Sequence, residues 1–267
     1  MQSWAGKVAI VTGASEGLGL SLARAWAERG AAVVLAARRA EPLQAAAESL
    51  ANTAAPVLTV PTDVTRQEDV DRLAAATLEQ FGRIDALVNN AGRSARQAIE
   101  DTTPADFQEL WELNFLSVVR CTRACLPQLL ERGGHVVNIG SLAGKIGARW
   151  IGAYPASKFP VSAYSQQLRL ELGPRGLHVL LVSPGPIARQ QPRERDEATL
   201  AALPESARRP GGGAKTRAID PAWLAARVVQ ACDARRAELV VPSAARWLAA
   251  VGQLWPGMGD WLIRRAT

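Results

Sequence analysis

The chain has 267 residues, of which 48% are hydrophobic and 21% are charged, so it is long enough to fold as one α/β domain with a sizeable core. No run approaches the roughly 18 apolar residues of a membrane span, so no transmembrane helix is predicted. The 31 basic and 25 acidic residues give a net charge of +6, but the basic residues are scattered without a Lys/Arg block, which does not favour a nucleic-acid-binding protein.

The first predicted strand, residues 8–11, begins too early for a signal peptide to precede it, so we expect a cytoplasmic protein. The strand leads into Gly13, Gly17 and Gly19, and a helix is predicted over residues 18–29. Glycines here permit a tight turn, and the N–H groups at the start of the helix attract a phosphate. Glycine-rich turns also occur for structural reasons alone, but the order strand, turn, helix favours a dinucleotide site.

The second predicted strand, residues 32–36, is followed by Ala37, Arg38 and Arg39, and then by a helix predicted over residues 42–50. In dinucleotide-binding folds an acidic residue near the end of this strand binds the ribose hydroxyls of NAD, whereas arginine accommodates the 2′-phosphate of NADP. Ala37 stands where the acidic residue would be, and a guanidinium group binds phosphate through charge-assisted hydrogen bonds. The sequence therefore predicts NADP(H), with a solvated arginine pair before a helix as the alternative.

The third and fourth strands are predicted at residues 57–60 and 84–88, with a helix at residues 67–81 between them, and a long helix follows at residues 105–131. Asn114 lies inside that long helix among apolar neighbours. Asparagine is a poor residue for a helix interior, and burying its amide is unfavourable unless the amide is hydrogen-bonded. Asn114 is therefore a candidate functional residue, with a helix-bending role as the structural alternative.

Two cysteines are candidate metal ligands, and both histidines of the chain are candidate catalytic residues. Cys121 and Cys125 stand four residues apart on the predicted long helix. Because no histidine or acidic cluster accompanies them, we predict buried apolar thiols and no metal site. His135 and His178 begin or flank the fifth and sixth predicted strands, and we expect them at solvated strand ends.

After a fifth predicted strand at residues 135–139, a helix is predicted over residues 153–172. Tyr154 and Lys158 are four residues apart on this helix and are therefore neighbours. An ammonium group beside a phenol lowers the pKa of the phenol, and a proton-transferring group works best when its pKa lies near the operating pH. The same spacing also occurs on many helix surfaces. Pro160 removes a backbone donor inside the helix, so we expect a local kink there.

The remaining predicted elements are a sixth strand at residues 177–182, a helix at residues 221–234 and a seventh strand at residues 239–241. Fully apolar strands that alternate with helices predict a single α/β domain over residues 1–267, a Rossmann-type doubly wound sheet of seven parallel strands with helices on both faces. The segment at about 186–218 breaks the alternation, and it is either a mobile solvated loop or a lid over the substrate.

The C-terminal segment, at about 244–267, is predicted to form an amphipathic helix that Pro256 and Gly257 end. The alternatives are that it packs on the chain's own core, forms a subunit interface or the rim of the substrate pocket, or makes shallow contact with a membrane. Its apolar stripe follows the i, i+1, i+4, i+7, i+8 pattern of one helix face and consists of Trp247, Leu248, Val251, Leu254 and Trp255.

Taken in order, these motifs resemble those of the single-domain short-chain dehydrogenases/reductases, and the resemblance runs nearly from end to end. The glycine turn has the spacing Thr-Gly-x-x-x-Gly-x-Gly, and Tyr154 and Lys158 form a Tyr-x-x-x-Lys pair. The family's other motifs each stand at the end of the expected strand or on the expected helix, namely Asp63-Val64, Asn89-Asn90-Ala91-Gly92, Asn114, Ser141 and Pro184-Gly185.

The resemblance implies that Asn114, Ser141, Tyr154 and Lys158 are catalytic. Tyr154 would exchange a proton with the substrate oxygen as hydride is transferred, and Ser141 would orient that oxygen, so both would bind substrate. Lys158 would also hold the nicotinamide ribose, and Asn114 would hold a water that links the lysine to solvent.

The resemblance also implies how the cofactor is bound. Asp63 would receive the adenine amino group, residues 90–92 would line the ribose, and the backbone of residues 184–187 would meet the carboxamide of the nicotinamide. The complete set expected to bind cofactor is Gly13, Ser15, Gly17, Leu18, Gly19, Arg38, Arg39, Asp63, Val64, Asn90, Ala91, Gly92, Tyr154, Lys158, Pro184, Gly185 and Ile187.

We therefore predict an NADP(H)-dependent oxidoreductase that interconverts a small carbonyl compound and an alcohol and works as a homo-oligomer, a dimer or tetramer. The substrate pocket is expected at residues 93–97, residues 145–151 and the long loop. The alternative from another class is a catalytically idle NADP(H)-binding regulator of the same fold, against which the intact set of proton-handling residues argues.

Overall fold

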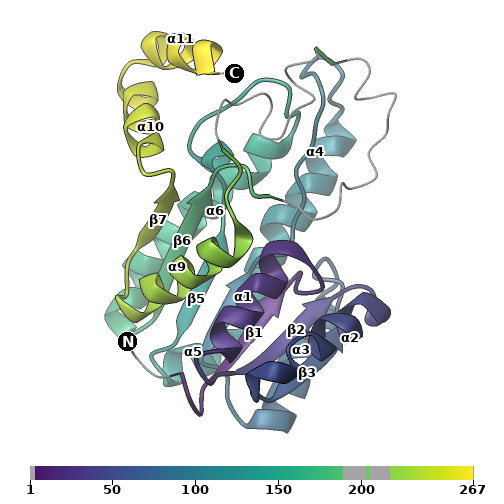
Figure 1. Ribbon diagram of the computed structural model, residues 1–267. Coiled ribbons are helices and arrows are strands. Elements are labelled where there is room, and N and C mark those ends of the chain that lie inside the picture. The colour runs from purple at the N-terminus through teal and green to yellow at the C-terminus, as the bar shows by residue number, and fades with distance from the viewer. Residues whose placement is uncertain (1–3, 189–202, 205–216, 267) are drawn as a thin grey trace.

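A seven-stranded parallel sheet organises the molecule (Figure 1), whose computed structural model describes residues 4–188, 203–204 and 217–266. The strand order is β3-β2-β1-β4-β5-β6-β7, so the predicted doubly wound α/β fold is confirmed. The strands are β1 (Val8–Thr12), β2 (Ala32–Ala37), β3 (Val57–Pro61), β4 (Ala86–Asn89), β5 (His135–Ile139), β6 (His178–Pro184) and β7 (Glu238–Val241).

Helices cover both faces of this sheet. Alternate strand residues point to opposite faces, so Ala9 and Val11 of β1 join one apolar cluster while Val8 and Ile10 join the other. The first cluster contains side chains of α1, α2 and α9, and Figure 1 shows α1 and α9 in front of the sheet; the second contains side chains of α3, α5 and α6. The helices are α1 (Gly17–Ala27), α2 (Ala40–Glu48), α3 (Gln67–Phe81), α4 (Pro104–Trp111), α5 (Ser117–Glu131), α6 (Tyr154–Leu172), α9 (Pro221–Asp233), α10 (Ala245–Leu254) and α11 (Pro256–Ala266).

The strand order reverses at β1, which pairs with β2 on one side and with β4 on the other. Open sheets of this kind bind ligands outside the carboxyl ends of their strands at such a switch point. The glycine turn follows β1 at this edge, and the segments that follow β4, β5 and β6 leave the same edge because all seven strands are parallel.

The helix predicted over residues 105–131 is present from residue 104 to residue 131, but it contains a π-helical turn that the sequence did not indicate. α4 ends at Trp111, a π-helical turn spans Glu112–Leu116, and α5 begins at Ser117. Asn114 lies in the π-helical turn, where its side chain bonds a neighbouring loop. α6, in contrast, runs as one helix from Tyr154 to Leu172 with Pro160 inside it.

The predicted burial of the two cysteines is confirmed, and the histidine prediction is wrong. Cys121 and Cys125 are buried against the sheet, and burial raises the pKa of both thiols. His135 and His178 are also buried, because Trp4 covers His135 with its ring centroid 5.1 Å away. Their Nδ1 atoms are 2.8 Å apart, and His178 Nε2 lies 2.9 Å from the Arg236 carbonyl oxygen. The carbonyl can only accept, so His178 Nε2–H donates to it and the neutral His178 Nδ1 accepts from His135.

Most of the predicted loop at 186–218 lies outside the described residues, so neither reading of it is tested. Its two ends are described, and they are held together: Ile187 pairs with Ile219 in a parallel bridge, and Ala188 N–H donates to the Ile219 carbonyl oxygen at 2.8 Å. Leu203, also described, is buried against Ala98 and Trp150.

The C-terminal segment forms two helices, and α10 ends before Pro256 as predicted. α10 is fully described and has no buried residue, so the alternative that its stripe packs on the chain's own core is wrong. Figure 1 shows α10 and α11 standing away from the helices that cover the sheet. Among residues 4–188, 203–204 and 217–266, no helix has the length and apolar character that crossing a bilayer requires.

Candidate active site

The turn after β1 forms a backbone cradle at the N-terminus of α1. Gly13 and Gly17 have φ angles of +64° and +56°, in the left-handed region that favours glycine. A Cβ on Gly19 would lie 2.0 Å from the Gly13 carbonyl oxygen, so only glycine fits there. Within the described chain, the side chain of Glu16 makes no capping bond to α1. The backbone N–H groups of this helix start, which the helix itself cannot pair, therefore fit a diphosphate.

Thr12 and Asn90 join this turn to the end of β4. Asn90 Nδ2 donates to the Thr12 carbonyl oxygen at 2.9 Å and to the Gly13 carbonyl oxygen at 3.2 Å. The backbone N–H groups of Asn90 and Ala91 both donate to Thr12 Oγ1 at 3.0 Å. These bonds hold two predicted cofactor-binding segments side by side. The sequence did not single out Thr12 as a site residue, although its place directly before Gly13 was a usable signal.

The predicted adenosine-binding residues lie at the carboxyl ends of β2 and β3. Asp63 Oδ1 accepts hydrogen bonds from the backbone N–H and the hydroxyl of Thr65, at 3.0 and 2.7 Å, which fixes the turn after β3. Val64 beside it is buried. Arg38 and Arg39 are both exposed between β2 and α2, where a negatively charged ligand can reach them.

On the other side of the switch point, the chain leaves β6 through Pro184 and Gly185. The Gly185 N–H donates to the Val241 carbonyl oxygen at 2.7 Å, so this exit is fixed against β7. Ile187 is then held by its bridge to Ile219. The backbone predicted to meet the nicotinamide carboxamide is thus anchored at the same edge of the sheet as the glycine turn.

Lys158 is buried on the first turns of α6, and its Nζ donates to the Ile139 carbonyl oxygen at 2.9 Å. Burial lowers the pKa of this lysine to about 8, because the charged form loses its hydration. Ile139 ends β5, two residues before Ser141, so the bond ties Lys158 to the strand end that carries Ser141. Tyr154 begins the same helix one turn before the lysine.

Ser141 caps a short 3₁₀ helix, Leu142–Gly144, that packs directly on α6. Ser141 Oγ accepts from the Ala143 N–H at 3.1 Å, which leaves its hydroxyl hydrogen able to donate to a ligand. A Cβ on Gly144 would lie 2.7 Å from the Lys158 carbonyl oxygen. Glycine at this position therefore lets the Ser141 turn approach the helix that carries Tyr154 and Lys158.

The amide of Asn114 is fully buried and bonded on both sides. Its Oδ1 accepts from the Arg93 N–H, and its Nδ2 donates to the Arg93 carbonyl oxygen and to Ser157 Oγ, all at 2.9 Å. Ser157 Oγ in turn donates to the Tyr154 carbonyl oxygen at 2.8 Å. Asn114 thus links the loop after β4 to the first turn of α6. The predicted water relay through Asn114 stays a prediction. The sequence did not single out Ser157, although a serine inside a helix signals a side-chain hydrogen bond.

The structure therefore gathers the predicted residues into two groups along one edge of the sheet. Asn114, Ser141, Tyr154 and Lys158 are connected through the end of β5 and the start of α6, while the glycine turn and the ends of β2 and β3 offer backbone N–H groups and arginines. A phenol, a hydroxyl and a buried ammonium group beside a cradle for a diphosphate suit proton transfer coupled to chemistry on a bound dinucleotide.

Comparisons with known proteins agree with this arrangement. A family model described as short chain dehydrogenase matches residues 7–199. The L-fucose dehydrogenase of Oryctolagus cuniculus is 36% identical over 229 residues, which are 85% of this chain and 78% of that protein. The 11-beta-hydroxysteroid dehydrogenase A of Sesamum indicum is 40% identical over 185 residues, 68% of this chain and 52% of that protein.

Two solved structures are also similar. The crystal structure of a short-chain dehydrogenase from Streptomyces avermitilis matches with a TM-score of 0.82 and 34% identity and covers 97% of this chain and 96% of that one. The L-sorbose reductase of Gluconobacter frateurii, solved with NADPH and L-sorbose, matches with a TM-score of 0.77 and 28% identity and covers 90% of this chain and 96% of that one.

Proposed function

Because the chain belongs to the short-chain dehydrogenase/reductase family of oxidoreductases, we propose that it transfers hydride between NADP(H) and the carbonyl or secondary alcohol carbon of a small molecule. The observation that carries this proposal is the buried Lys158, one helical turn after Tyr154 and bonded to the strand end that leads to Ser141. The bound nicotinamide supplies or accepts the hydride.

In this proposal Tyr154 handles the proton. In the direction of reduction its hydroxyl donates a proton to the substrate oxygen, and in the direction of oxidation it takes that proton back. The ammonium group of Lys158 favours the phenolate and so lowers the pKa of Tyr154. Ser141 donates its hydroxyl hydrogen to the substrate oxygen as negative charge develops there. Asn114 positions Tyr154 through Ser157, whose hydroxyl bonds the Tyr154 carbonyl oxygen.

We propose a preference for NADP(H) over NAD(H) because Arg38 and Arg39 are exposed directly after β2. Dinucleotide-binding folds bind the 2′-phosphate of NADP at this position. Family members use NAD(H) or NADP(H), and the L-sorbose reductase that resembles this chain was solved with NADPH. Ala37, the last residue of β2, stands where an acidic residue would repel the phosphate.

We also propose that the protein is cytoplasmic and self-associates as a dimer or tetramer. Support for self-association comes from α4, where Phe107 and Trp111 are 36% and 41% exposed beside a cavity that reaches Leu116 and Ala156. Large exposed apolar side chains that gather at one place mark interaction sites.

The test is a screen of aldehydes, ketones, keto sugars and secondary alcohols with the purified protein, followed through the absorbance of reduced nicotinamide. We expect turnover of at least one class, faster with NADPH than with NADH, and its loss in the Lys158→Met variant. Tight NADPH binding without turnover of any compound would favour the catalytically idle regulator and contradict the proposal.

A further inference from the structure

The two C-terminal helices form a closely packed unit, which we call the C-terminal hairpin (α10 and α11). A Cβ built on Gly259 would lie 2.4 Å from the Gly252 Cα, so the two helices cross with their backbones in contact. The Gly259 N–H donates to the Trp255 carbonyl oxygen at 2.9 Å, and the Trp255 N–H donates to the Val251 carbonyl oxygen at 2.8 Å. Since no large side chain fits at this crossing, large apolar side chains near it must lie on other faces.

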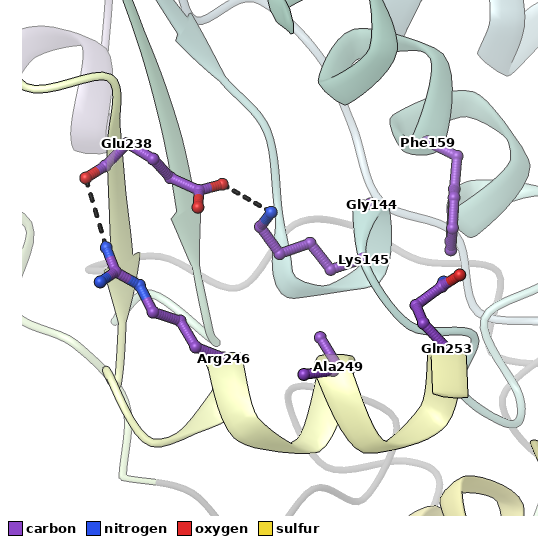
Figure 2. A pocket seen from close by; sticks show the side chains of 8 residues that line it. Gly144, Lys145, Phe159, Glu238, Arg246, Ala249 and Gln253 are labelled. Atoms are coloured by element: carbon purple, nitrogen blue, oxygen red, sulfur yellow. Dashed lines mark hydrogen bonds and ion pairs between the residues drawn. The ribbon is translucent and has the colours of Figure 1, made fainter. Parts of the chain in front are cut away.

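The face of α10 that looks toward the body of the protein is small and polar (Figure 2). Arg246, Ala249 and Gln253 line a cavity of about 440 Å³ whose other wall includes Lys145 and Glu238. Lys145 pairs with the Glu238 carboxylate at 2.5 Å, and Arg246 donates to the Glu238 backbone carbonyl oxygen at 3.4 Å. Amphipathic helices of globular proteins turn their apolar face to the core, and α10 turns its polar face there instead.

Five large apolar side chains of the C-terminal hairpin are in solvent, whereas Leu248, Val251, Leu262 and Ile263 are half-buried. The exposed fraction reaches 77% for Trp247 and 68% for Leu254. An exposed apolar patch on this scale marks a surface that binds something. Its members, each at least 47% exposed, are Trp247, Leu254, Trp255, Met258 and Trp261.

The charges around the patch are mainly positive. α11 carries Arg264 and Arg265 against Asp260, which gives 2 − 1 = +1, while Arg246 of α10 lines the cavity on the other face. The Arg265 guanidinium lies over the Trp261 ring, 4.0 Å from its centroid. Tryptophan prefers the interface between lipid and water, and arginine binds anionic headgroups, so an amphipathic helix with both lies flat on a lipid surface.

From this combination we propose that the C-terminal hairpin docks the protein onto an anionic lipid surface. A second copy of the chain fits the patch less well, because a two-fold interface brings the same patch of both copies together and so places net positive charge against net positive charge. α10 follows β7 at the carboxyl edge of the sheet. The C-terminal hairpin therefore extends from the same edge of the sheet that carries the candidate active site. The proposal does not depend on the reaction proposed above, because its test measures binding alone.

The test is co-sedimentation of the full chain with vesicles of phosphatidylcholine alone or mixed with phosphatidylglycerol. We expect binding to the anionic vesicles that weakens with added salt, and little binding to phosphatidylcholine alone. The double variant Trp247→Ser with Trp261→Ser should bind the anionic vesicles about tenfold more weakly or worse, since it loses two interfacial anchors.

The matched control is Trp223→Ser. Trp223 on α9 is also about half exposed and also lies near an arginine, with Arg227 5.9 Å from its ring centroid, but it is outside the C-terminal hairpin. This variant should bind like the unmodified protein. The proposal is overturned if the unmodified protein ignores anionic vesicles, or if Trp223→Ser weakens binding as much as the double variant. It is also overturned if the double variant splits the oligomer in sedimentation velocity while vesicle binding stays unchanged, because the patch is then a subunit interface.

Discussion

At the scale of single residues, the site depends on groups whose charge is set by burial. Lys158 is buried with one bond to the Ile139 carbonyl oxygen, and its pKa of about 8 keeps most of it protonated at neutral pH. A cation held so near Tyr154 along the helix favours the phenolate more than a mobile surface lysine does, because its charge is less screened. His135 has the other charge state. Burial and the neighbouring His178 lower its pKa to about 3, so this imidazole is neutral at neutral pH.

The proposed preference for NADP(H) should be inverted by changing two residues. Arg38→Ala with Ala37→Asp removes a partner of the 2′-phosphate and adds a carboxylate that binds the ribose hydroxyls of NAD and repels that phosphate. A charge-assisted hydrogen bond is worth about 1.5–3 kcal/mol, so the unmodified protein should prefer NADPH by roughly ten- to a hundredfold in kcat/KM and the double variant should prefer NADH. Steady-state kinetics with both cofactors checks this. Equal kcat/KM for the two cofactors in the unmodified protein would show that Arg38 does not bind the 2′-phosphate.

The buried histidines predict how stability depends on pH. His135 titrates near its ordinary 6.5 when unfolded but only near 3 when folded, so below pH 6.5 the unfolded chain binds a proton that the folded protein does not. Stability should therefore be constant from pH 7 upward to about pH 8 and fall below pH 6.5, with His135 alone costing about 2 kcal/mol of unfolding free energy at pH 5. The chain has only two histidines, so this window reports on them. Urea unfolding at pH 7, 6 and 5 measures the effect, and identical midpoints would contradict the burial of the pair.

At the scale of elements, the Ser141 turn is placed by its contact with α6. The contact is made at Gly144, where a Cβ would lie 2.7 Å from the Lys158 carbonyl oxygen. That oxygen is backbone and cannot move aside, so a larger residue displaces either the turn that carries Ser141 or the helix that carries Tyr154 and Lys158. Catalytic geometry tolerates little displacement, since about 1 Å can cost on the order of a hundredfold in rate.

Gly144→Ala should therefore lower kcat at least tenfold while NADPH affinity changes little, because the glycine turn after β1 is untouched. The matched control is Gly173→Ala, directly after α6 and outside the expected substrate pocket, where an added Cβ meets nothing within 4 Å. Turnover and NADPH titration of both variants give the comparison. Equal activities would show that the Gly144 contact does not position the site.

Most elements could be predicted from the local sequence. The exceptions depend on contacts between residues that are far apart in the chain. The strands are apolar, β-branched runs buried on both faces, so their positions could be read directly. The π-helical turn at Asn114 could not be predicted in this way, because bonds to Arg93 and Ser157 hold it and the apolar periodicity continues through it. His135 is buried by Trp4, which lies 131 positions earlier. The stripe of α10 was correctly located, but periodicity gives a helix face and not the direction in which that face points.

At the scale of the whole molecule, parallel strands bring residues from distant segments to one edge. The glycine turn, the Asn90 segment, and Ser141 with the start of α6 come from three different connections, and the bonds of Asn90, Lys158 and Asn114 join them. The C-terminal hairpin extends from the same edge. The candidate catalytic residues could be located from their motifs, whereas the surroundings of the substrate could not, because the segment between β6 and α9 that is expected to contribute to them lies mostly outside the described residues.

The Tyr154→Phe variant tests the proposed reaction most directly, because it removes only the hydroxyl and keeps the aromatic ring. General acid–base catalysis is typically worth about 10²–10⁴ in rate, so turnover of the best substrate with NADPH should fall by that factor. NADPH affinity, measured by titrating the fluorescence of the reduced cofactor, should stay within about twofold, since the hydroxyl is not proposed to bind the adenosine half. Retention of more than about a tenth of the activity, with cofactor binding intact, would contradict the assignment of Tyr154 as the group that moves the proton.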